Sequence, residues 1–224
     1  PGHCAKRHRD ALTGEGDQVG GKRGFDVGLE GAQQVVRLGR MRRARVTHAA
    51  TLGCLMMTGR ALLLIRHAKA VADALTDVHR PLTERGHRDA QAAGRWLAEL
   101  GIAVDLVVVS PATRARETWA AIATTAPARD ERIDERVYIN TVEALLSAIV
   151  EIPDDVATLA LVGHNPSMQG LAITLDDGDG DDEARAAIHD GYPTCGITVF
   201  DIDRPWSELA HGDATLRVFS APRG

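Results

Sequence analysis

Four residues of types that bind anions follow short apolar segments of the chain: Arg66, His67, Arg114 and His164. An arginine side chain presents a planar fork of N–H donors, which matches the oxygens of a phosphate group in geometry and charge. Two arginines and two histidines that converge would form a site for a multiply charged anion. Phosphate is the obvious candidate.

The position of these side chains depends on the elements that precede them. The continuous apolar run at 61–65 is typical of a strand that is covered on both faces, and the mainly apolar segments at 104–109 and 158–162 are predicted to be buried strands as well. Two further strands are predicted at 196–202 and 216–220. Each of the first three runs ends abruptly in polar residues.

Capping residues and helical periodicity predict helices between these strands. Thr83 is the predicted N-cap of the first helix and Gly101 its C-terminal stop. Ser110 is the predicted N-cap of the second, which has Pro111 in its first turn and runs to about Thr124. The other predictions, in chain order, are a weak segment at 132–139, a helix near 142–150, a helix behind the N-cap and first-turn pair Asn165-Pro166, and a solvated loop over the acidic stretch 176–183.

Strands that alternate with helices predict an α/β fold with three layers, in which a mostly parallel sheet has helices on both faces. The last two strands have no helix between them, so at least one strand near the C-terminus is expected to run antiparallel. The carboxyl ends of parallel strands share one edge of a sheet, and ligands bind there. The two arginines and two histidines are therefore expected to meet at that edge, where helix N-termini would add N–H donors.

Most of the remaining arginines and histidines are expected to have no part in such a site. Arg85, Arg88, Arg116, His87, His189 and His211 are predicted to be ordinary surface or turn residues. A metal site is the rival interpretation for the two histidines that follow strands. They have no His-x-x-x-His spacing and no carboxylate partner, and the adjacent arginines would repel a cation. No metal and no cofactor is predicted.

Four motifs, in the same order, resemble those of the histidine phosphatase superfamily, which has the phosphoglycerate-mutase-like fold. The motifs are LIRHAKA at 64–70, DVHRPLTERG at 77–86, SPATRARET at 110–118 and VGHNP at 162–166. The small size and the late element Tyr192-Pro193-Thr194 are similar to the compact SixA-type branch, the phosphohistidine phosphatases. The resemblance covers roughly residues 60–224.

The resemblance implies a mechanism. His67 would be the nucleophile and would form a covalent phosphohistidine intermediate, which water then hydrolyses. An acceptor, expected to be a backbone carbonyl, would hold its other ring nitrogen and fix the tautomer. Arg66, Arg114 and His164 would hold the phosphate oxygens. Arg80 is a candidate for substrate binding from the family pattern alone.

Many members of the superfamily have an acidic residue that acts as a general acid and protonates an alkoxide leaving group. This chain departs from that pattern. Asp134 and Glu135 are the acidic residues in the corresponding region, and Glu135 is the candidate for this role. The compact branch generally lacks the acid, since imidazole leaves phosphorus more readily than an alkoxide does. Glu135 therefore discriminates between a phosphohistidine substrate and an ordinary phosphomonoester. Ala68 replaces the usual glycine after the histidine, which is a small change.

The leading hypothesis is a metal-independent phosphatase that removes phosphate from phosphohistidine on a carrier or phosphotransfer protein. The alternatives are a small-molecule phosphomonoesterase and, less favoured, a non-catalytic module that binds phosphorylated ligands. A mutase is disfavoured, because the chain has few insertions from which to build a lid over the phosphoenzyme. The protein is expected to act as a monomer.

The composition fits a globular protein of one or two domains. The chain has 224 residues, of which 44% are hydrophobic, 25% charged and only 4% aromatic. The three cysteines are scattered and form neither a disulfide framework nor zinc spacing, which indicates a reducing compartment. No apolar run approaches the length of about 20 residues that a membrane span requires.

Residues 1–57 differ from the rest. They hold 10 Lys and Arg against 5 Asp and Glu, together with 10 of the 22 glycines, which leaves a net charge of −10 on residues 58–224. The first segment is interpreted as a basic, Gly-rich extension, disordered or not native, and the second as the histidine phosphatase domain. The acidic domain argues against nucleic acid as a partner. A basic nucleic-acid arm within 1–57 would have no recognisable motif.

A targeting signal is the other alternative for this segment. Met41-Arg42-Arg43 and the weakly apolar stretch 46–57 mimic a signal peptide, and Leu52-Gly53-Cys54 faintly resembles a lipoprotein cleavage site. Polar residues interrupt the stretch, and it would have to start internally. A cytoplasmic protein that does not bind membranes is therefore predicted.

Overall fold

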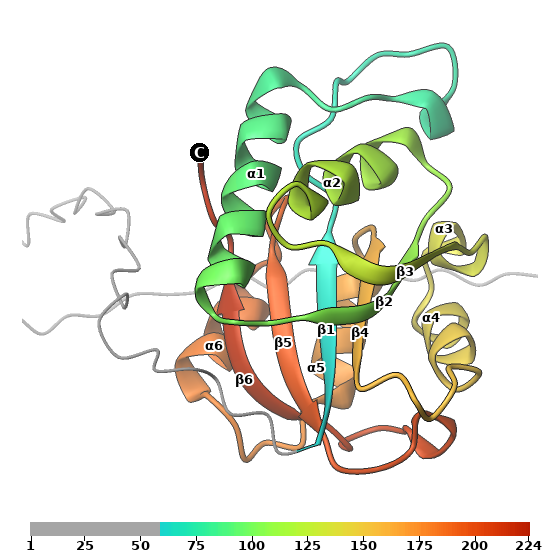
Figure 1. Ribbon diagram of the computed structural model, residues 1–224, viewed down its shortest axis with the longest axis vertical. Coiled ribbons are helices and arrows are strands. Elements are labelled where there is room, and N and C mark those ends of the chain that lie inside the picture. Colours follow the sequence, from blue (N-terminus) through green and yellow to red (C-terminus); the bar gives the residue numbers. More distant parts are fainter. Residues whose placement is uncertain (1–58) are drawn as a thin grey trace, which may run out of the picture. The chain divides into compact units, whose positions relative to one another are not determined.

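The computed structural model describes residues 59–224, and the structural statements that follow concern this part of the chain. Its centre is a six-stranded sheet with the strand order β3-β2-β4-β1-β5-β6 (Figure 1). The strands are β1 (Arg60–Arg66), β2 (Val104–Val109), β3 (Ala128–Ile133), β4 (Thr158–Gly163), β5 (Ile197–Ile202) and β6 (Thr215–Ser220). The predictions for residues 1–57 lie outside the described residues.

The sheet is mixed, as the strand pattern predicts. β1 pairs parallel with β4, and β2 pairs parallel with both β4 and β3. β5 runs antiparallel to β1, and β6 runs antiparallel to β5. The prediction of a mostly parallel α/β sheet with an antiparallel strand near the C-terminus is confirmed.

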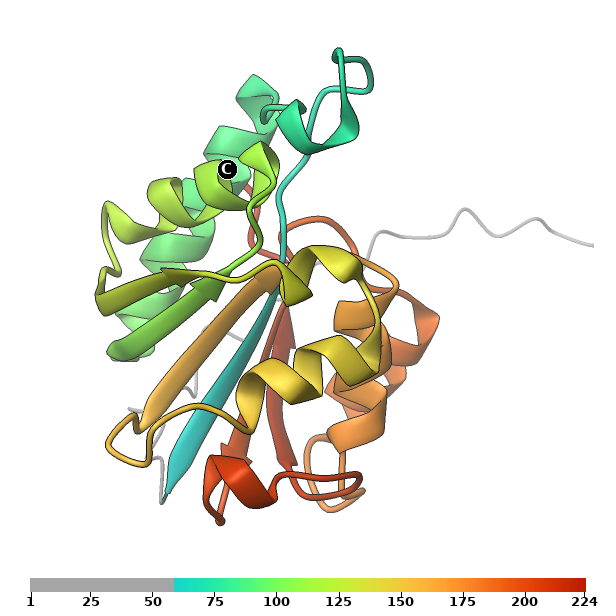
Figure 2. The ribbon, with the colours of Figure 1, turned by 90° about the vertical axis from the view of Figure 1, so that its right-hand side faces the viewer.

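Helices cover both faces of the sheet and complete three layers (Figure 2). Helices α1 (Glu84–Glu99) and α2 (Thr113–Ala123) lie on one face. The opposite face carries α4 (Val142–Ile149), α5 (Ser167–Leu175) and α6 (Asp182–Asp190). The single turn α3 (Arg136–Ile139) and the 3-10 turns η1 (Asp77–His79) and η2 (Trp206–Glu208) complete the described elements.

Two hydrophobic clusters hold the layers together, one on each face of the sheet. Alternate residues of β1 point to opposite faces, so Leu62 and Leu64 join one cluster while Leu63 and Ile65 join the other. The first cluster packs against α4 and α5, and the second against α1 and α2. Because β1 is buried on both faces, its position and that of the residues directly after it are firmly fixed.

The start of α1 fixes the segment that follows β1. Thr83 is the N-cap, as predicted, and its hydroxyl accepts a hydrogen bond from the Gly86 N–H at 3.0 Å. The Thr83 N–H and hydroxyl both donate to the Lys69 carbonyl, at 2.8 and 3.0 Å. A Cβ at Gly86 would lie 2.2 Å from that carbonyl oxygen, so only glycine permits this close approach. Gly101 follows the helix with φ of +69°, in agreement with its predicted role as a stop.

Two predicted N-caps are wrong. α2 begins at Thr113 with Ala112 in the cap position, and α5 begins at Ser167 with Pro166 in the cap position. Neither cap residue makes a side-chain capping bond. The Ser110 hydroxyl pairs with a histidine ring and accepts from the N–H of Ala112, which precedes the first residue of α2. The Asn165 amide donates to the Tyr192 carbonyl.

The acidic stretch 176–183 is also more ordered than predicted. Its last two residues form the first turn of α6, where the Asp181 side chain accepts from the Ala184 N–H at 3.0 Å. Acidic residues stabilise a helix N-terminus, so a charge run that suggests a loop also fits a helix start. Arg185 pairs with Asp176 and Asp182 across this turn. The weak segment predicted at 132–139 divides into the end of β3 and the turn α3.

No helix between residues 59 and 224 is both long enough and apolar enough to cross a membrane. The cysteine within this range, Cys195, is buried and unpaired. Its backbone has φ of +60°, and its N–H donates to the carbonyls of Arg66 and His67, each at 3.1 Å. Cys195 thereby ties the antiparallel half of the sheet to the residues that follow β1.

Candidate active site

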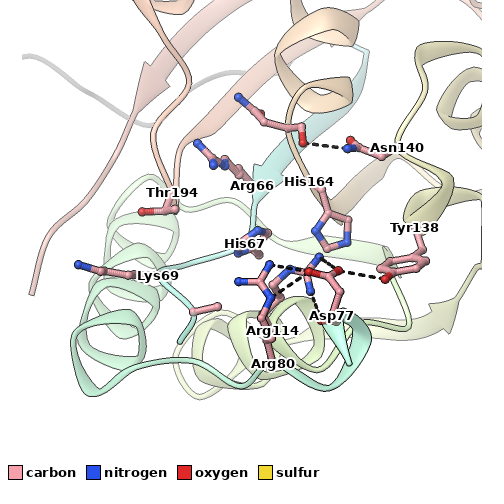
Figure 3. Close-up of a pocket in the computed structure, with 12 residues that line it drawn as sticks. Arg66, His67, Lys69, Asp77, Arg80, Arg114, Tyr138, Asn140, His164 and Thr194 are labelled. Carbon is pink, nitrogen blue, oxygen red and sulfur yellow. Dashed lines mark hydrogen bonds and ion pairs between the residues drawn. The ribbon is translucent and has the colours of Figure 1, made fainter. Parts of the chain in front are cut away.

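The carboxyl ends of the parallel strands open onto a cavity of about 620 Å³ (Figure 3). In the strand register, Arg66 at the end of β1 lies opposite Gly163 at the end of β4, so His67 and His164 follow neighbouring strands. β2 ends at Val109, one loop before Arg114 in α2. The cavity is lined by all four residues predicted to meet there and by Arg80, together with Lys69, Ala70, Asp77, Tyr138, Asn140, Asn165 and Thr194.

His67 is held as a neutral ring. Its Nδ1 lies 2.7 Å from the Ala68 carbonyl oxygen. A carbonyl can only accept, so Nδ1 carries the proton and Nε2 keeps a free lone pair. Burial, reinforced by the charges of Arg114 and Arg66, lowers the pKa of His67 to about 4. The expected backbone acceptor is present, and the ring has the tautomer that a nucleophile requires.

His164 is a second neutral ring beside the first. The two ring centroids are 5.1 Å apart, and burial together with the nearby His67 lowers the pKa of His164 to about 3. Its Nε2 lies 2.8 Å from the Ser110 hydroxyl oxygen, which also accepts from the Ala112 N–H at 3.3 Å. When the Ser110 hydroxyl donates to Nε2, the ring proton of His164 is on Nδ1. This Nδ1 is buried without a partner among the described residues, so it is available to donate to a bound anion.

The arginines are fixed by neighbouring groups. Arg66 donates to the Tyr192 carbonyl, and its Nε is buried without a partner in the described part of the chain. Arg114 is only 5% exposed, and its Nη1 donates to the Asp77 carbonyl at 2.7 Å. Arg80 donates from Nη1 to the Val71 carbonyl at 3.0 Å. The guanidinium groups are therefore held in place before any ligand arrives, which lowers the reorganisation needed to bind one.

Asp77 is a cavity residue to which the sequence analysis assigned no role. Its carboxylate lies between Arg80 Nε at 2.9 Å, Arg114 Nη2 at 3.0 Å and the Tyr138 hydroxyl at 3.0 Å (Figure 3). Burial acts to raise its pKa, but the hydrogen bonds from Arg80, Tyr138 and Arg114 outweigh it and lower the pKa to about 2. The spacing of Asp77 and Arg80, three residues apart around one turn, is the sequence signal that could have indicated this pair.

The predicted general acid lies elsewhere. Glu135 is exposed in the N-cap position of α3 and does not line the cavity. Asp134 is paired with Arg136, at 2.7 Å to Nη2, which together with the hydrogen bonds of that arginine lowers the pKa of the carboxyl. Neither carboxyl group is positioned to deliver a proton to a ligand in the cavity.

The short turn α3 and its C-cap residue contribute two other residues that sequence reasoning missed. The Tyr138 ring meets the His164 ring edge-on, with centroids 5.7 Å apart. Asn140, with φ of +65°, donates to the Asn165 carbonyl at 2.8 Å and accepts from the Ser167 N–H at 3.1 Å. These contacts fix the loop that carries His164. Tyr and Asn in a weakly patterned segment gave no signal of this function.

The side chains around the two histidine rings bear on the metal interpretation. Within residues 59–224, no group of three or more His, Cys, Asp or Glu side chains is placed to hold a metal ion. The charged groups that surround the two histidine rings are mainly arginines, which favour an anion.

Comparisons with known proteins agree with the geometry. The family model of the histidine phosphatase superfamily (branch 1) matches residues 62–145. The uncharacterised protein Rv1276c of Mycobacterium tuberculosis is 42% identical over 161 residues, which are 71% of this chain and 100% of that protein. Phosphohistidine phosphatase SixA of Escherichia coli is 28% identical over 123 residues, 53% of this chain and 75% of SixA. A solved structure of a candidate phosphohistidine phosphatase SixA from Nakamurella multipartitia is 33% identical, with a TM-score of 0.66, and the match covers 73% of this chain and 96% of that one.

Proposed function

The chain belongs to the histidine phosphatase superfamily and is a phosphatase, and from this premise we propose that its substrate is phosphohistidine on a protein. The proposed partner is a phosphorylated carrier or phosphotransfer domain. The likeness to proteins named phosphohistidine phosphatase supports this choice. The observation that carries it is the protonation chemistry of the cavity.

Within residues 59–224, the cavity has no carboxyl group suited to protonate a leaving group near pH 7. Among the described residues that line the cavity, Asp77 is the one with a carboxyl group. Its pKa of about 2 keeps that group ionised. Glu135 is exposed outside the lining. An alkoxide needs a proton from a general acid in order to leave, whereas an imidazole can leave as a neutral ring. The described site therefore suits a phosphoramidate better than an alkyl phosphate.

The first step transfers the phosphoryl group to the enzyme. The lone pair on His67 Nε2 forms a bond to phosphorus while the bond from phosphorus to the substrate ring nitrogen breaks, and its electron pair stays on that nitrogen. Arg66, Arg114 and the Nδ1–H of His164 stabilise the charge on the phosphoryl oxygens. These donors are the side chains that line the cavity around His67 (Figure 3).

The second step hydrolyses the intermediate. A water oxygen forms a bond to phosphorus, the bond to His67 Nε2 breaks, and the electron pair returns to that nitrogen. The proton of the water passes to solvent or to the released phosphate. The Nδ1–H bond to the Ala68 carbonyl holds the ring in one orientation through both steps.

The acid limb of the pH profile should report the His67 ring. As pH falls through the His67 pKa of about 4, Nε2 takes up a proton and loses the lone pair that attacks phosphorus. We expect kcat/KM for para-nitrophenyl phosphate, corrected for protonation of the substrate, to fall about tenfold per pH unit below that point. Recovery of full activity after return to pH 7 controls for acid unfolding. An acid limb near the ordinary histidine pKa of about 6.5 would contradict a buried, neutral nucleophile.

The proposed substrate is tested by comparing two substrates. The full chain, with EDTA and no added metal, is assayed on a histidine-phosphorylated protein domain and on para-nitrophenyl phosphate, with Glu135→Gln as the comparison enzyme. We expect kcat/KM to be much higher for the phosphohistidine domain, Glu135→Gln to match the wild type on both substrates, and EDTA to have no effect.

Each part of the proposal has its own contrary result. Faster turnover of the aryl phosphate, or no turnover of the phosphohistidine domain, overturns the protein substrate and points to a small phosphate ester. A loss of rate in Glu135→Gln on a poor alkoxide leaving group would show that this residue is the general acid after all. A strong loss of rate with EDTA would restore the metal interpretation.

A further inference from the structure

A carboxylate that lines an anion site needs a physical reason. Asp77 accepts hydrogen bonds from Arg80 and Arg114, which are donors that a bound phosphate would use. Its negative charge opposes phosphate binding, so by itself it weakens the function of the cavity. Arg114 does not depend on the carboxylate alone for its position, since its Nη1 also donates to the Asp77 backbone carbonyl at 2.7 Å.

The chemistry of phosphohistidine supplies a counterpart for this charge. The substrate ring has two nitrogens, one bonded to phosphorus and one that can carry a proton. When the distal nitrogen is protonated, the ring is a cation, and it leaves phosphorus as neutral imidazole once the P–N bond electrons return to it. A carboxylate that accepts from the distal N–H favours this protonated ring, as an opposite charge does for any titrating group.

We propose that Asp77 recognises the protonated imidazole of a phosphohistidine substrate by accepting a hydrogen bond from its distal ring N–H. This inference rests on the proposed function and assigns Asp77 as a specificity-determining residue of the same site. Asp77 is well placed for the role, because its side chain is 54% exposed and lines the cavity, so an incoming ring can reach it.

The hydrogen-bond inventory of Asp77 is compatible with an exchange of partners. Oδ1 is occupied by Arg80, at 2.9 Å from Nε and 2.8 Å from Nη2, while Oδ2 accepts from Arg114 and the Tyr138 hydroxyl. The Tyr138 hydroxyl is a neutral donor in an exposed pair with Oδ2, so it can turn away and leave a lone pair on Oδ2 for the substrate N–H while Arg114 stays in place. The carboxylate keeps its ionised form through the pairing with Arg80, which does not have to move.

In the resulting step, the bond from His67 Nε2 to phosphorus forms as the P–N bond to the substrate breaks. The electron pair of that bond goes to the substrate nitrogen, and the distal proton stays on the ring. No proton moves to or from Asp77, which is why a carboxylate that cannot act as a general acid still serves the reaction. An aryl phosphate gains nothing from this group, since its leaving phenolate is an anion.

The test compares Asp77→Asn with wild type in the full chain on two substrates. kcat/KM is measured for a histidine-phosphorylated protein domain and for para-nitrophenyl phosphate, and the ratio of the two values is the readout. We expect Asp77→Asn to lower the ratio about tenfold or more, because the amide cannot stabilise a cationic ring. Asp73→Asn, an exposed residue in the same loop that does not line the cavity, should leave the ratio unchanged.

Inhibition by inorganic phosphate distinguishes recognition of the substrate ring by Asp77 from a role in which Asp77 only supports Arg114. Removal of the negative charge should lower the inhibition constant in Asp77→Asn if Arg114 stays in place through the Asp77 backbone carbonyl. A raised inhibition constant with an equal loss on both substrates would show that Asp77 only supports Arg114, and it would overturn the inference. An unchanged ratio would overturn it as well.

The outcomes also distinguish this inference from the proposed function. A wild-type enzyme that does not hydrolyse the phosphohistidine domain refutes the proposed substrate itself. A wild-type enzyme that does, together with an unchanged ratio in Asp77→Asn, refutes the role of Asp77 alone. If Asp77→Asn does not fold, Asp77→Ser removes the same charge from the exposed turn η1 and takes its place in the comparison.

Discussion

Replacement of His67 by alanine is expected to lower kcat by at least about 10⁴-fold on every substrate, because the variant has no group to form the covalent intermediate. His164 cannot take over the attack. Its Nε2 is hydrogen-bonded to Ser110, and its Nδ1 carries the proton in the tautomer that this bond favours. The loss should appear in kcat rather than KM, since the donors that bind phosphate are all retained.

The measurement combines steady-state kinetics with trapping of the intermediate. Wild-type enzyme, quenched in alkali during turnover of a radiolabelled substrate, should carry label on one histidine, and His67→Ala should carry none. His189→Ala is the matched control, because His189 is exposed in α6 and does not line the cavity. Activity of His67→Ala within tenfold of wild type, with an unchanged melting temperature, would show that another residue is the nucleophile.

Much of the fold could be predicted because the strands are buried on both faces. Mainly apolar segments such as 104–109, which end abruptly in a polar residue, make the type and order of these strands clear from the sequence. The edge strand β3 is different. Its sequence, ARDERI, is largely exposed, and its pairing with β2 depends on backbone hydrogen bonds that no side-chain pattern reveals.

The predicted helix starts failed where a polar side chain had a tertiary partner. Ser110 and Asn165 have the right residue types for N-caps, but their side chains bond to His164 and to the Tyr192 carbonyl. Capping preferences describe only local competition for backbone N–H groups, whereas the Ser110 hydroxyl accepts from the Ala112 N–H and also pairs with the distant His164 ring. In each place one member of the pair lines the cavity, His164 in the first and Asn165 in the second, so the failed caps lie where the site is built.

The site residues that could be predicted depend on strand topology, and those that could not depend on contacts between distant segments. Arg66, His67 and His164 follow strand ends directly, so the topology of a parallel sheet is enough to bring them together. Asp77 and Tyr138 lie on turns between elements, and they reach the cavity through their contact with each other and with Arg114. Only the three-dimensional course of those turns shows that they meet.

Arg114→Ala is expected to lower kcat/KM by about 10²- to 10³-fold, or about 3–4 kcal/mol of transition-state stabilisation. Its guanidinium is buried and held before the substrate arrives, so the variant loses a preorganised charge that solvent cannot replace. Arg114→Lys should recover part of the loss, because a lysine keeps the charge but not the planar fork. Arg116→Ala, on the same helix but exposed, is the matched control and should be neutral.

Part of the effect of Arg114→Ala should come from Asp77. Without Arg114, the carboxylate keeps only Arg80 and Tyr138 as partners, and more of its negative charge faces the incoming phosphoryl group. The double variant Arg114→Ala/Asp77→Asn should therefore be more active on para-nitrophenyl phosphate than Arg114→Ala alone, a non-additive result that a double-mutant cycle measures. Additive losses would mean that the two side chains act independently on the substrate. Equal activity of Arg114→Ala and Arg116→Ala would show that Arg114 does not bind the phosphoryl group.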